Sequence, residues 1–269
     1  MYLGIDIGGT KTLIARMDND GVIVESKKYL TPKKYSEFLE LVSSSNFIHH
    51  DYKAIGVGAP GNINREKGIV KDFGNLEWKN VPLCKDLELI FKSPTFIEND
   101  AKLAGLSESM LVKDHYSKVL YITISTGVGY SLIDHTMLDP LIGDEGGKEI
   151  YFNKNGEYIS WEDQISGKAI VNRFGKMAKD INDPEIWESI SRDLAKGIIE
   201  LIAILEPQII IFGGSVGDYF DKYKDSLKKE LLKYQLPLMK MPVLKEAKRP
   251  DFAVIYGCYD FAKQKITHA

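Results

Sequence analysis

Two glycine-bearing segments of the chain carry side chains that suit phosphate binding. They read Asp6-Ile-Gly-Gly-Thr-Lys-Thr12 and Thr126-Gly-Val-Gly129. Glycines let a backbone approach a ligand with its N–H groups exposed, while Thr and Lys side chains donate to phosphate oxygens. A tight turn with a polar tip is the competing interpretation of each segment taken alone. The predicted phosphate-binding residues are Gly8, Gly9, Thr10, Lys11, Thr126 and Gly127.

A third segment, Glu98-Asn-Asp-Ala101, places two acids and an amide where a short strand is expected to meet a helix. Phosphoryl transfer needs a base beside the attacking hydroxyl, and Asp100 near a helix N-terminus is expected to stay ionised and to act as that base. Asn99 can donate to and accept from neighbouring sugar hydroxyls. Asn and Asp are also the preferred N-cap residues, and on this segment alone helix capping is the stronger interpretation.

Two further candidate sites are one for a metal ion and one for the adenine ring of a nucleotide. Asp6, at the end of the first predicted strand, and Asp100 are candidate ligands of Mg²⁺, which usually keeps several of its waters. Gly213 and Gly214 lie between an apolar strand and a helix, where they could admit the adenine ring of ATP. A tight strand–helix turn explains the two glycines equally well.

The run Gly56-Val-Gly-Ala-Pro-Gly61 matches the dinucleotide-binding pattern G-x-G-x-x-G but fails its structural requirement. That pattern needs a helix to begin at the glycines so that its N-terminus faces a pyrophosphate. Pro60 and the polar residues after it lead into a loop instead, so we reject this interpretation. The sequence also contains no G-x-x-x-x-G-K-[ST] phosphate loop.

The elements that would position these residues recur in two halves of the chain. Strands are expected at 2–7, 12–17, 22–28, 53–57 and 94–97, with helices at 35–42, 82–91 and 100–111, and a polar stretch at 62–80 is expected to be an irregular loop. The second half is expected to have strands at 119–125, 129–134, 208–212 and 252–255, a helix at 186–205 and a last helix from 256. We predict two related α/β lobes, 1–113 and 114–269, with the last helix packed on the first lobe.

Composition limits the function classes. The 269 residues are 44% hydrophobic and 27% charged, with a formal net charge of -3, which is globular and gives no basic attraction to nucleic acid. No apolar run reaches the roughly 18 residues of a membrane-spanning helix. Two distant cysteines imply no disulfide framework, and the beginning of the chain has no basic-then-apolar leader, so we expect a reduced, cytoplasmic compartment.

The ordered set of segments resembles the ROK family of sugar kinases and sugar-responsive repressors, within the actin/hexokinase/Hsp70 superfamily. The resemblance runs along essentially the whole chain. Its motifs are residues 4–11, 98–101, 125–129 and 211–214, which are similar to the first phosphate, catalytic, second phosphate and adenosine motifs of that family, in that order. It implies two ribonuclease H-like lobes of the actin-like ATPase fold, with the active site in a cleft between them. It also implies a homodimer, ATP and Mg²⁺.

By this resemblance Asp100 is the catalytic base, and further residues contact the sugar. Glu145 falls in a segment similar to the family's Gly-Glu-x-Gly-His, and Glu162 matches another sugar-contacting Glu. The residues that the resemblance assigns to the sugar are Gly61, Asn75, Asn99, Asp100, Glu145, Lys148 and Glu162.

Two departures from the family pattern concern the sugar and a metal. Lys148 stands where the family has a histidine that touches sugar and zinc, and residues 151–159 lack the cysteines of a zinc site. We expect a zinc-free loop there, held by packing instead. The change to Lys148 leaves the identity of the sugar open. No helix-turn-helix precedes Asp6, which disfavours the repressor branch.

The sequence therefore predicts ATP-dependent phosphorylation of a hexose hydroxyl, as in glucokinases. The alternatives are a kinase for an N-acetylhexosamine or another sugar, and a sugar-binding sensor that has lost catalysis. Another phosphoryl donor, such as polyphosphate, also remains open.

Overall fold

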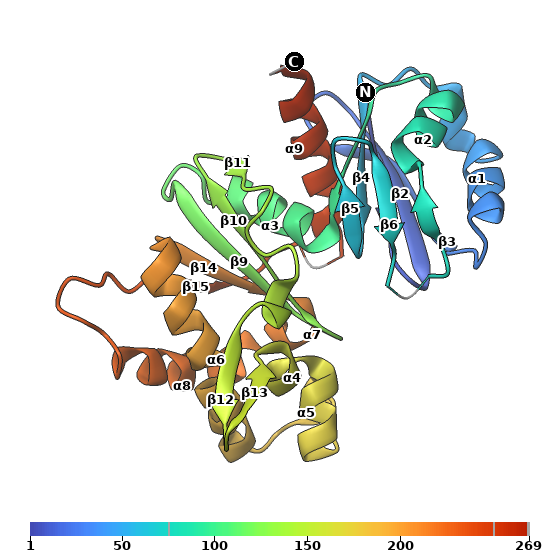
Figure 1. The fold of residues 1–269 in the computed structure, drawn as a ribbon. Coiled ribbons are helices and arrows are strands. Elements are labelled where there is room, and N and C mark those ends of the chain that lie inside the picture. Colours follow the sequence, from blue (N-terminus) through green and yellow to red (C-terminus); the bar gives the residue numbers. More distant parts are fainter. Residues whose placement is uncertain (75, 250, 268–269) are drawn as a thin grey trace. The chain divides into compact units, whose positions relative to one another are not determined.

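The computed structural model describes residues 1–74, 76–249 and 251–267. The chain divides into two compact units, Met1–Ser107 with Asp251–Ala269, and Glu108–Pro250 (Figure 1). The boundary predicted near residue 113 lies in the turn that follows helix α3 (Asp100–Met110). No helix in the described part of the chain combines the length and the apolarity needed to cross a bilayer.

The first unit is built on a five-stranded sheet of order β3-β2-β1-β4-β8. Strands β1, β2 and β3 form an antiparallel meander, and β4 and β8 add to β1 in parallel. Their bounds are β1 Tyr2–Ile7, β2 Lys11–Met17, β3 Ile23–Leu30, β4 Ala54–Ala59 and β8 Thr95–Asn99. This strand order, with three antiparallel and two parallel strands, is the ribonuclease H-like pattern that we predicted.

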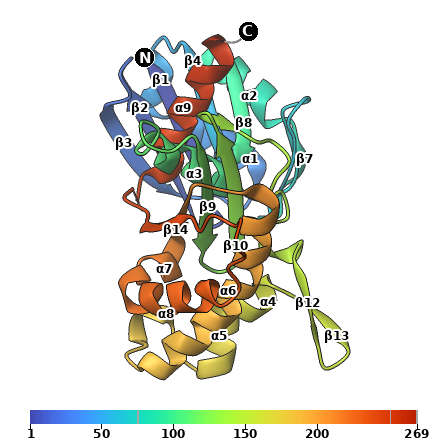
Figure 2. The same cartoon turned by 90° about the vertical axis from the view of Figure 1, so that its left-hand side faces the viewer.

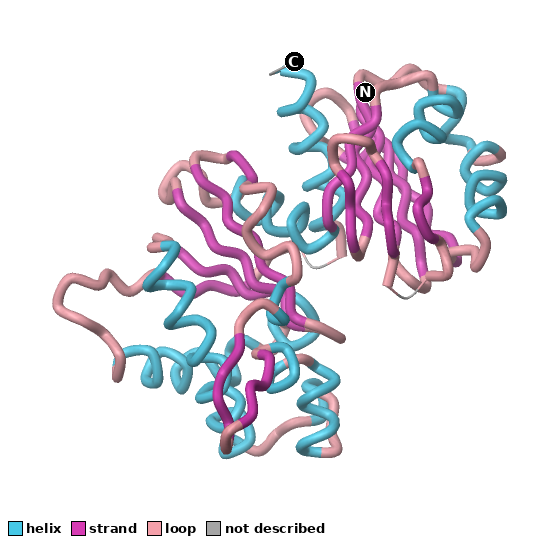
Figure 3. The backbone as a smooth tube through the Cα atoms, in the orientation of Figure 1, coloured by secondary structure: helices cyan, strands magenta, loops and turns pink. Residues whose placement is uncertain are grey.

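Helices cover both faces of this sheet (Figure 3). Helices α1 (Tyr35–Ser43) and α2 (Leu83–Phe91) bury Phe38, Val42 and Leu87 on one face, and a short 3₁₀ turn η1 (Asn46–His49) lies beside them. Helix α9 (Ala253–Thr267) covers the other face, where its backbone runs so close that a Cβ on Gly56 would lie 2.1 Å from the Cys258 carbonyl oxygen. The last helix therefore packs on the first unit.

Two predictions of local structure were wrong in this unit. The expected loop at 62–80 contains a small antiparallel sheet of β5 (Asn62–Asn64), β6 (Ile69–Asp72) and β7 (Lys79–Val81). Strands of three or four residues are too short to show an alternating pattern. The expected strand at 252–255 is instead the first turn of α9, because Ile255 is buried against β1 and β2 rather than in a sheet.

The second unit repeats the same sheet order with β11-β10-β9-β14-β15. Strands β9 and β10 form an antiparallel hairpin, and β14 and β15 add in parallel beside β9. The bounds are β9 Lys118–Ile124, β10 Val128–Asp134, β11 Met137–Leu138, β14 Ile209–Gly213 and β15 Val243–Glu246. The repeated order confirms the predicted pair of related α/β folds.

One long helix supplies much of the core of this unit. Helix α6 (Pro184–Leu205) starts with Pro184 behind an Asp183 side chain that accepts the Glu185 N–H, a favourable helix start. Its buried residues recur every three or four positions and pack with α8 (Phe220–Leu232) over the sheet. The remaining elements are η2 Gly146–Lys148, α4 Glu162–Ile165, α5 Gly167–Phe174, η3 Ala178–Asp180 and α7 Gly214–Gly217.

Residues 151–160 form a hairpin of β12 (Tyr151–Lys154) and β13 (Glu157–Ser160) that projects from the rest of this unit (Figure 2). We expected this segment to be a loop held by packing. Instead, four facing residue pairs hold the two strands together, while Tyr151 and Tyr158 are exposed.

Candidate functional site

The carboxyl ends of three neighbouring strands meet in the first unit and carry the predicted acids. Asp6 on β1 faces Gly58 on β4, and Gly58 faces Glu98 on β8, after which Asp100 begins α3. A Cβ on Gly58 would lie 2.4 Å from a Val254 methyl of α9, so only glycine fits between the sheet and this helix. The parallel register thus brings Asp6 and Asp100 together although they lie far apart in the sequence.

The two carboxyl groups influence each other's protonation. Burial raises the pKa of Asp6 to about 7, with the charge of Asp100 as a second cause and Lys28 acting in the opposite direction. Burial also raises the pKa of Asp100, while backbone N–H groups, including that of Ala101 at 2.7 Å from Oδ1, lower it. We expected the helix terminus to keep Asp100 ionised, but burial has the larger effect on its pKa. A carboxylate with a raised pKa is better matched to a general base working near neutral pH.

The side chain that caps helix α3 is that of Asn99 rather than that of Asp100. The Asn99 Oδ1 accepts the Lys102 N–H at 3.2 Å, while the Asp100 carboxylate accepts the N–H of the residue next to it. The Asn99 side chain therefore caps α3 with its oxygen and keeps its two amide protons for a ligand. The capping interpretation accounts for Asn99 and leaves the partly buried carboxylate of Asp100 without that structural explanation.

The first glycine segment forms the turn between β1 and β2. The Gly8 N–H donates to the Lys11 carbonyl at 2.9 Å, and the Thr31 hydroxyl donates to the Gly8 carbonyl at 2.7 Å. These bonds fix the turn from inside, while Gly9, Thr10 and Lys11 are exposed. Gly8 itself has no room for a side chain, because a Cβ would lie 2.9 Å from the Lys11 carbonyl oxygen.

Gly61 lies between β4 and β5 in a left-handed conformation, with φ of 87°. A Cβ there would come within 2.0 Å of the Asp72 carbonyl oxygen, so glycine is required by conformation and by space. Gly61 is exposed beside the end of β4, on the same chain segment that leads from Gly58. Asn75, another predicted sugar contact, lies outside the described residues.

The second glycine segment, in the second unit, is held by Glu162. The Val128 N–H donates to Glu162 Oε2 at 2.8 Å, and a Cβ on Gly127 would lie 2.7 Å from the same oxygen. A further bond, from the Gly167 N–H to the Ser125 carbonyl at 2.6 Å, joins this turn to the start of α5. Glu162, which we predicted as a sugar contact, therefore fixes the second glycine segment.

Lys148 lies next to Glu162 in the same unit, with 4.0 Å between Lys148 Nζ and Glu162 Oε1. The Lys148 side chain is 62% exposed, so the ammonium is available to a ligand. Glu145 is exposed just before η2, and its backbone N–H donates to Glu149 Oε1 at 2.5 Å. The structure thus groups Lys148 with Glu162, as the predicted role in sugar binding requires.

A cavity of about 430 Å³ opens beside the second glycine segment. Thr126 lines it from the turn, Ser215 from α7 and Tyr219 from the residues before α8. The complete lining is Ser125, Thr126, Gly167, Lys168, Val171, Asn172, Met177, Ala178, Lys179, Ser215, Val216, Asp218 and Tyr219. Its size and mixed apolar and polar walls suit the base and ribose of a nucleotide.

Gly213 and Gly214, which we predicted at the adenine site, do not line this cavity. A Cβ on Gly213 would lie 2.2 Å from the Tyr121 hydroxyl, and one on Gly214 would lie 2.5 Å from the Ile124 carbonyl oxygen. The glycines bring β14 close to β9 so that Ser215 and Val216 reach the cavity. Sequence reasoning missed the apolar wall of Val171, Met177 and Tyr219, because no motif marks apolar residues scattered over separate helices and loops.

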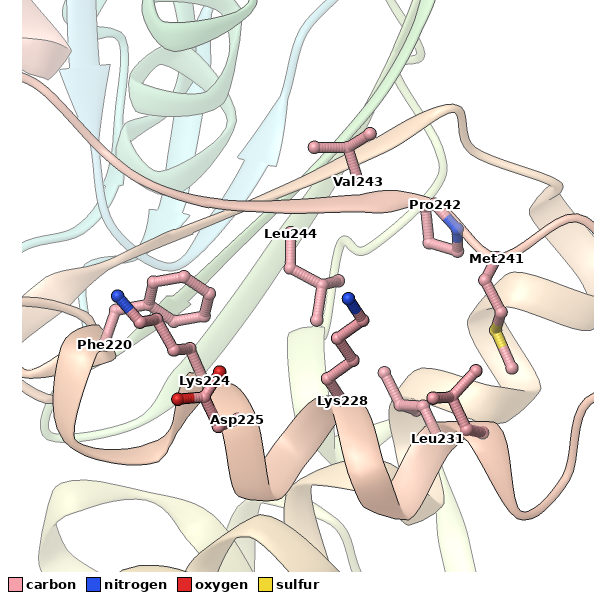
Figure 4. Close-up of a pocket in the computed structure, with 10 residues that line it drawn as sticks. Phe220, Lys224, Asp225, Lys228, Leu231, Met241, Pro242, Val243 and Leu244 are labelled. Carbon is pink, nitrogen blue, oxygen red and sulfur yellow. The ribbon is translucent and has the colours of Figure 1, made fainter.

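A separate cavity of about 410 Å³ lies between α8 and β15 (Figure 4). Phe220, Leu231 and Leu244 form apolar walls, and Lys224 and Lys228 project from α8. None of the predicted site residues that the structure describes lies in it, so we do not include it in the candidate site.

The described residues contain no group of three or more His, Cys, Asp or Glu side chains that could hold a metal. Asp6 and Asp100 form a pair of carboxylates instead, and the charge of Asp100 raises the pKa of Asp6. An oxygen pair of this kind fits Mg²⁺, which takes one or two carboxylates and keeps water as its other ligands. A cation there would offset the negative charge of the ionised pair.

The model of the ROK family matches residues 2–265. The chain belongs to the ROK family. A glucokinase of Streptomyces coelicolor is 26% identical over 278 residues, covering 85% of this chain and 86% of that protein. An N-acetyl-D-glucosamine kinase of Pasteurella multocida is 27% identical over 299 residues, covering 96% of this chain and 97% of the relative.

The crystal structure of a ROK family glucokinase from Streptomyces griseus, in complex with glucose and AMPPNP, superimposes with a TM-score of 0.78. It is 22% identical and covers 98% of this chain and 99% of its own. This likeness confirms the predicted actin-like ATPase fold of the ROK chain.

Proposed function

We propose that this ROK protein is a sugar kinase that transfers the γ-phosphoryl group of ATP to a hexose hydroxyl, with Asp100 as the general base. The observation that carries the proposal is the partly buried carboxylate of Asp100 beside Asp6, with its pKa raised by loss of solvation. The relatives support the reaction class, because those named here are kinases of glucose and of N-acetyl-D-glucosamine.

The reaction needs one proton transfer and one phosphoryl transfer. Asp100 accepts the proton of the sugar hydroxyl while that oxygen bonds to the γ-phosphorus, and the bond from phosphorus to the ADP oxygen breaks. The amide protons of Asn99 and the backbone at Gly61 orient the sugar from the first unit. Within the second unit, Glu145, Lys148 and Glu162 are the residues that we assign to the sugar.

The donor contacts follow from the two glycine turns. Gly9, Thr10 and Lys11 present exposed N–H, hydroxyl and ammonium groups to phosphate oxygens, and Thr126 and Gly127 do the same in the second unit. Mg²⁺ held by Asp6 and Asp100 through water would neutralise charge on the phosphates. The proton transfer needs no further group, because the Asp100 carboxylate accepts the proton of the sugar hydroxyl.

The cavity beside Thr126 favours ATP over polyphosphate as the donor. Its apolar surface comes from Val171, Met177, Val216 and Tyr219. An adenine ring can pack against such a surface, whereas a polyphosphate chain is charged along its whole length and gains nothing from it. Lys168 and Lys179 lie on its border, where they can meet phosphate or ribose oxygens.

A sugar-binding sensor that has lost catalysis is the second candidate, because Lys148 replaces the histidine of the ROK pattern. The presence of Asp100 and of both glycine turns argues against loss of catalysis. An ADP-release assay with ATP and Mg²⁺ on glucose, fructose, mannose and N-acetylglucosamine tests the proposal, with polyphosphate as a second donor. Sugar-dependent ADP release supports the kinase. Thermal stabilisation by a sugar without ADP release would support the sensor instead.

A further inference from the structure

Arg65 and Glu98 form a buried ion pair in the first unit that no motif of the sequence pointed to. The Arg65 Nε donates to Glu98 Oε2 and the Arg65 Nη2 donates to Glu98 Oε1, both at 2.7 Å. The Glu98 side chain is 1% exposed and that of Arg65 is 25% exposed. This is the two-pronged geometry in which a planar guanidinium fixes a carboxylate in both distance and orientation.

One end of this pair sets the backbone that carries the candidate base. Glu98 Oε1 also accepts the Asn99 N–H at 2.7 Å, so the same carboxylate is bonded to the peptide that precedes Asp100. The Asn99 side chain then caps α3 through the Lys102 N–H. Because a buried carboxylate is costly unless its bonds are satisfied, Glu98 has little freedom to move once Arg65 holds it.

The other end of the pair lies in the turn between β5 and β6. Asn64 Oδ1 accepts the Lys67 N–H at 3.0 Å, and the Gly68 carbonyl accepts the Cys84 N–H of α2 at 3.1 Å. These bonds make the turn rigid and attach it to α2. The strand that enters the turn starts directly after Gly61, a predicted sugar contact.

We propose that Arg65 is a positioning residue for the sugar. Its bonds to Glu98 hold the small sheet that follows Gly61 in a fixed place relative to the segment of Asn99 and Asp100. The inference rests on the proposed function, since it assigns Arg65 a role at the same site. A displaced β5–β6 turn would leave the sugar hydroxyl away from the Asp100 carboxylate. Misplacement by about 1 Å can cost on the order of 100-fold in rate.

Arg65→Lys tests the geometry, because it keeps the charge and loses the two-pronged bond. We expect the sugar KM to rise about 10-fold and kcat to fall about 10-fold, with the ATP KM unchanged within about twofold. Arg16→Lys is the matched control, since Arg16 pairs with Glu25 at 3.2 Å in the same unit and lies away from Asp100 in the sheet. It should leave both KM values unchanged.

Arg65→Met and the double variant Arg65→Met, Glu98→Gln separate positioning from stability. The single variant leaves a buried carboxylate unpaired and should lower Tm by about 5 °C or more, whereas the added Glu98→Gln change removes that charge and should restore most of the loss. The sugar KM should stay raised in the double variant. Recovery of the sugar KM together with Tm would overturn the proposal and leave the pair a purely stabilising one.

The wild-type protein distinguishes this inference from the proposed function. If it binds glucose or N-acetylglucosamine without phosphorylating it, the kinase proposal fails, and the same variants are compared by sugar-dependent Tm shift, in which Arg65→Lys should weaken sugar binding about 10-fold. A wild-type chain that neither phosphorylates nor binds any of the four sugars overturns both.

Discussion

Asp6 and Asp100 stand at the ends of different elements of one sheet, and the charge of Asp100 helps to raise the pKa of Asp6 to about 7. Burial is the larger cause. Folding therefore brings two acids into a setting in which at least one prefers to be protonated near neutral pH. Such a pair is costly to the apo protein and is the kind of feature retained for function rather than for stability.

The first prediction concerns stability against pH. Because the pKa of Asp6 is raised from 3.8 to about 7, the folded state keeps a proton that the unfolded state releases between pH 4 and pH 7. The free energy of unfolding therefore falls as the pH rises through that window and levels off above it, by at most roughly 4 kcal/mol. Asp6→Asn should remove this fall, so that the variant is more stable than the wild type at pH 8 and similar at pH 4.

Urea unfolding of both proteins at pH 4 and pH 8 measures the difference. Mg²⁺ should stabilise the wild type at pH 8 and have little effect on the variant, because the cation needs the ionised pair. Equal pH dependence in the two proteins would show that Asp6 titrates normally.

The second prediction concerns the turn held by Glu162. Gly127→Ala should push its Cβ against Glu162 Oε2 and disturb the bond from the Val128 N–H at 2.8 Å. We expect the ATP KM to rise about 10-fold, with a smaller effect on the sugar KM, since the turn presents its N–H groups to phosphate. Steady-state kinetics in each substrate checks this. An unchanged ATP KM in a folded variant would exclude the turn from donor binding.

The third prediction separates the two cavities. Val171→Trp should fill the cavity beside Thr126 and raise the ATP KM about 10-fold or more, while leaving the affinity for sugar intact. Val243→Trp is the matched control, because Val243 is similarly exposed, 41% against 38%, and lines the cavity between α8 and β15. If Val243→Trp raised the ATP KM and Val171→Trp did not, the nucleotide would have to bind in the cavity between α8 and β15 instead.

The fourth prediction concerns Lys148. Because the Lys148 side chain is 62% exposed and lies 4.0 Å from Glu162, its ion pair contributes little to stability, about 1 kcal/mol at most. Lys148→Met should leave Tm nearly unchanged and raise the sugar KM about 10-fold. Lys148→His, the residue of the ROK pattern, should change the order of preference among glucose, mannose and N-acetylglucosamine. The same preference order in all three proteins would remove Lys148 from sugar recognition.

The sequence predicted those elements whose structure is determined by residues close together in the chain. Glycine turns between β-rich runs and the helical spacing of apolar residues in 186–205 identify their elements from nearby residues alone, although the start of α6 at Pro184 was placed two residues late. The ordered motifs then indicated the fold and the residues of the site. Strands of three or four residues, such as β5 and β6, were missed because they are too short to show an alternating pattern.

The site features that the sequence did not indicate depend on contacts between separated segments. Arg65 and Glu98 are 33 residues apart and meet only because β5 lies near the end of β8. The apolar wall formed by Val171, Met177 and Tyr219 comes from helices and loops of no distinctive composition. The raised pKa of Asp100 follows from burial, which a motif cannot report.

The turnover number of Asp100→Asn tests the central claim most directly. Asp183→Asn is the control, since Asp183 is a helix N-cap whose side chain accepts the Glu185 N–H at 2.9 Å. We predict that Asp100→Asn lowers kcat about 1,000-fold, with the sugar affinity kept within about threefold and the fold intact, whereas the control keeps full activity. A kcat of Asp100→Asn within about tenfold of the wild type, with the sugar still phosphorylated, would show that Asp100 is not the base.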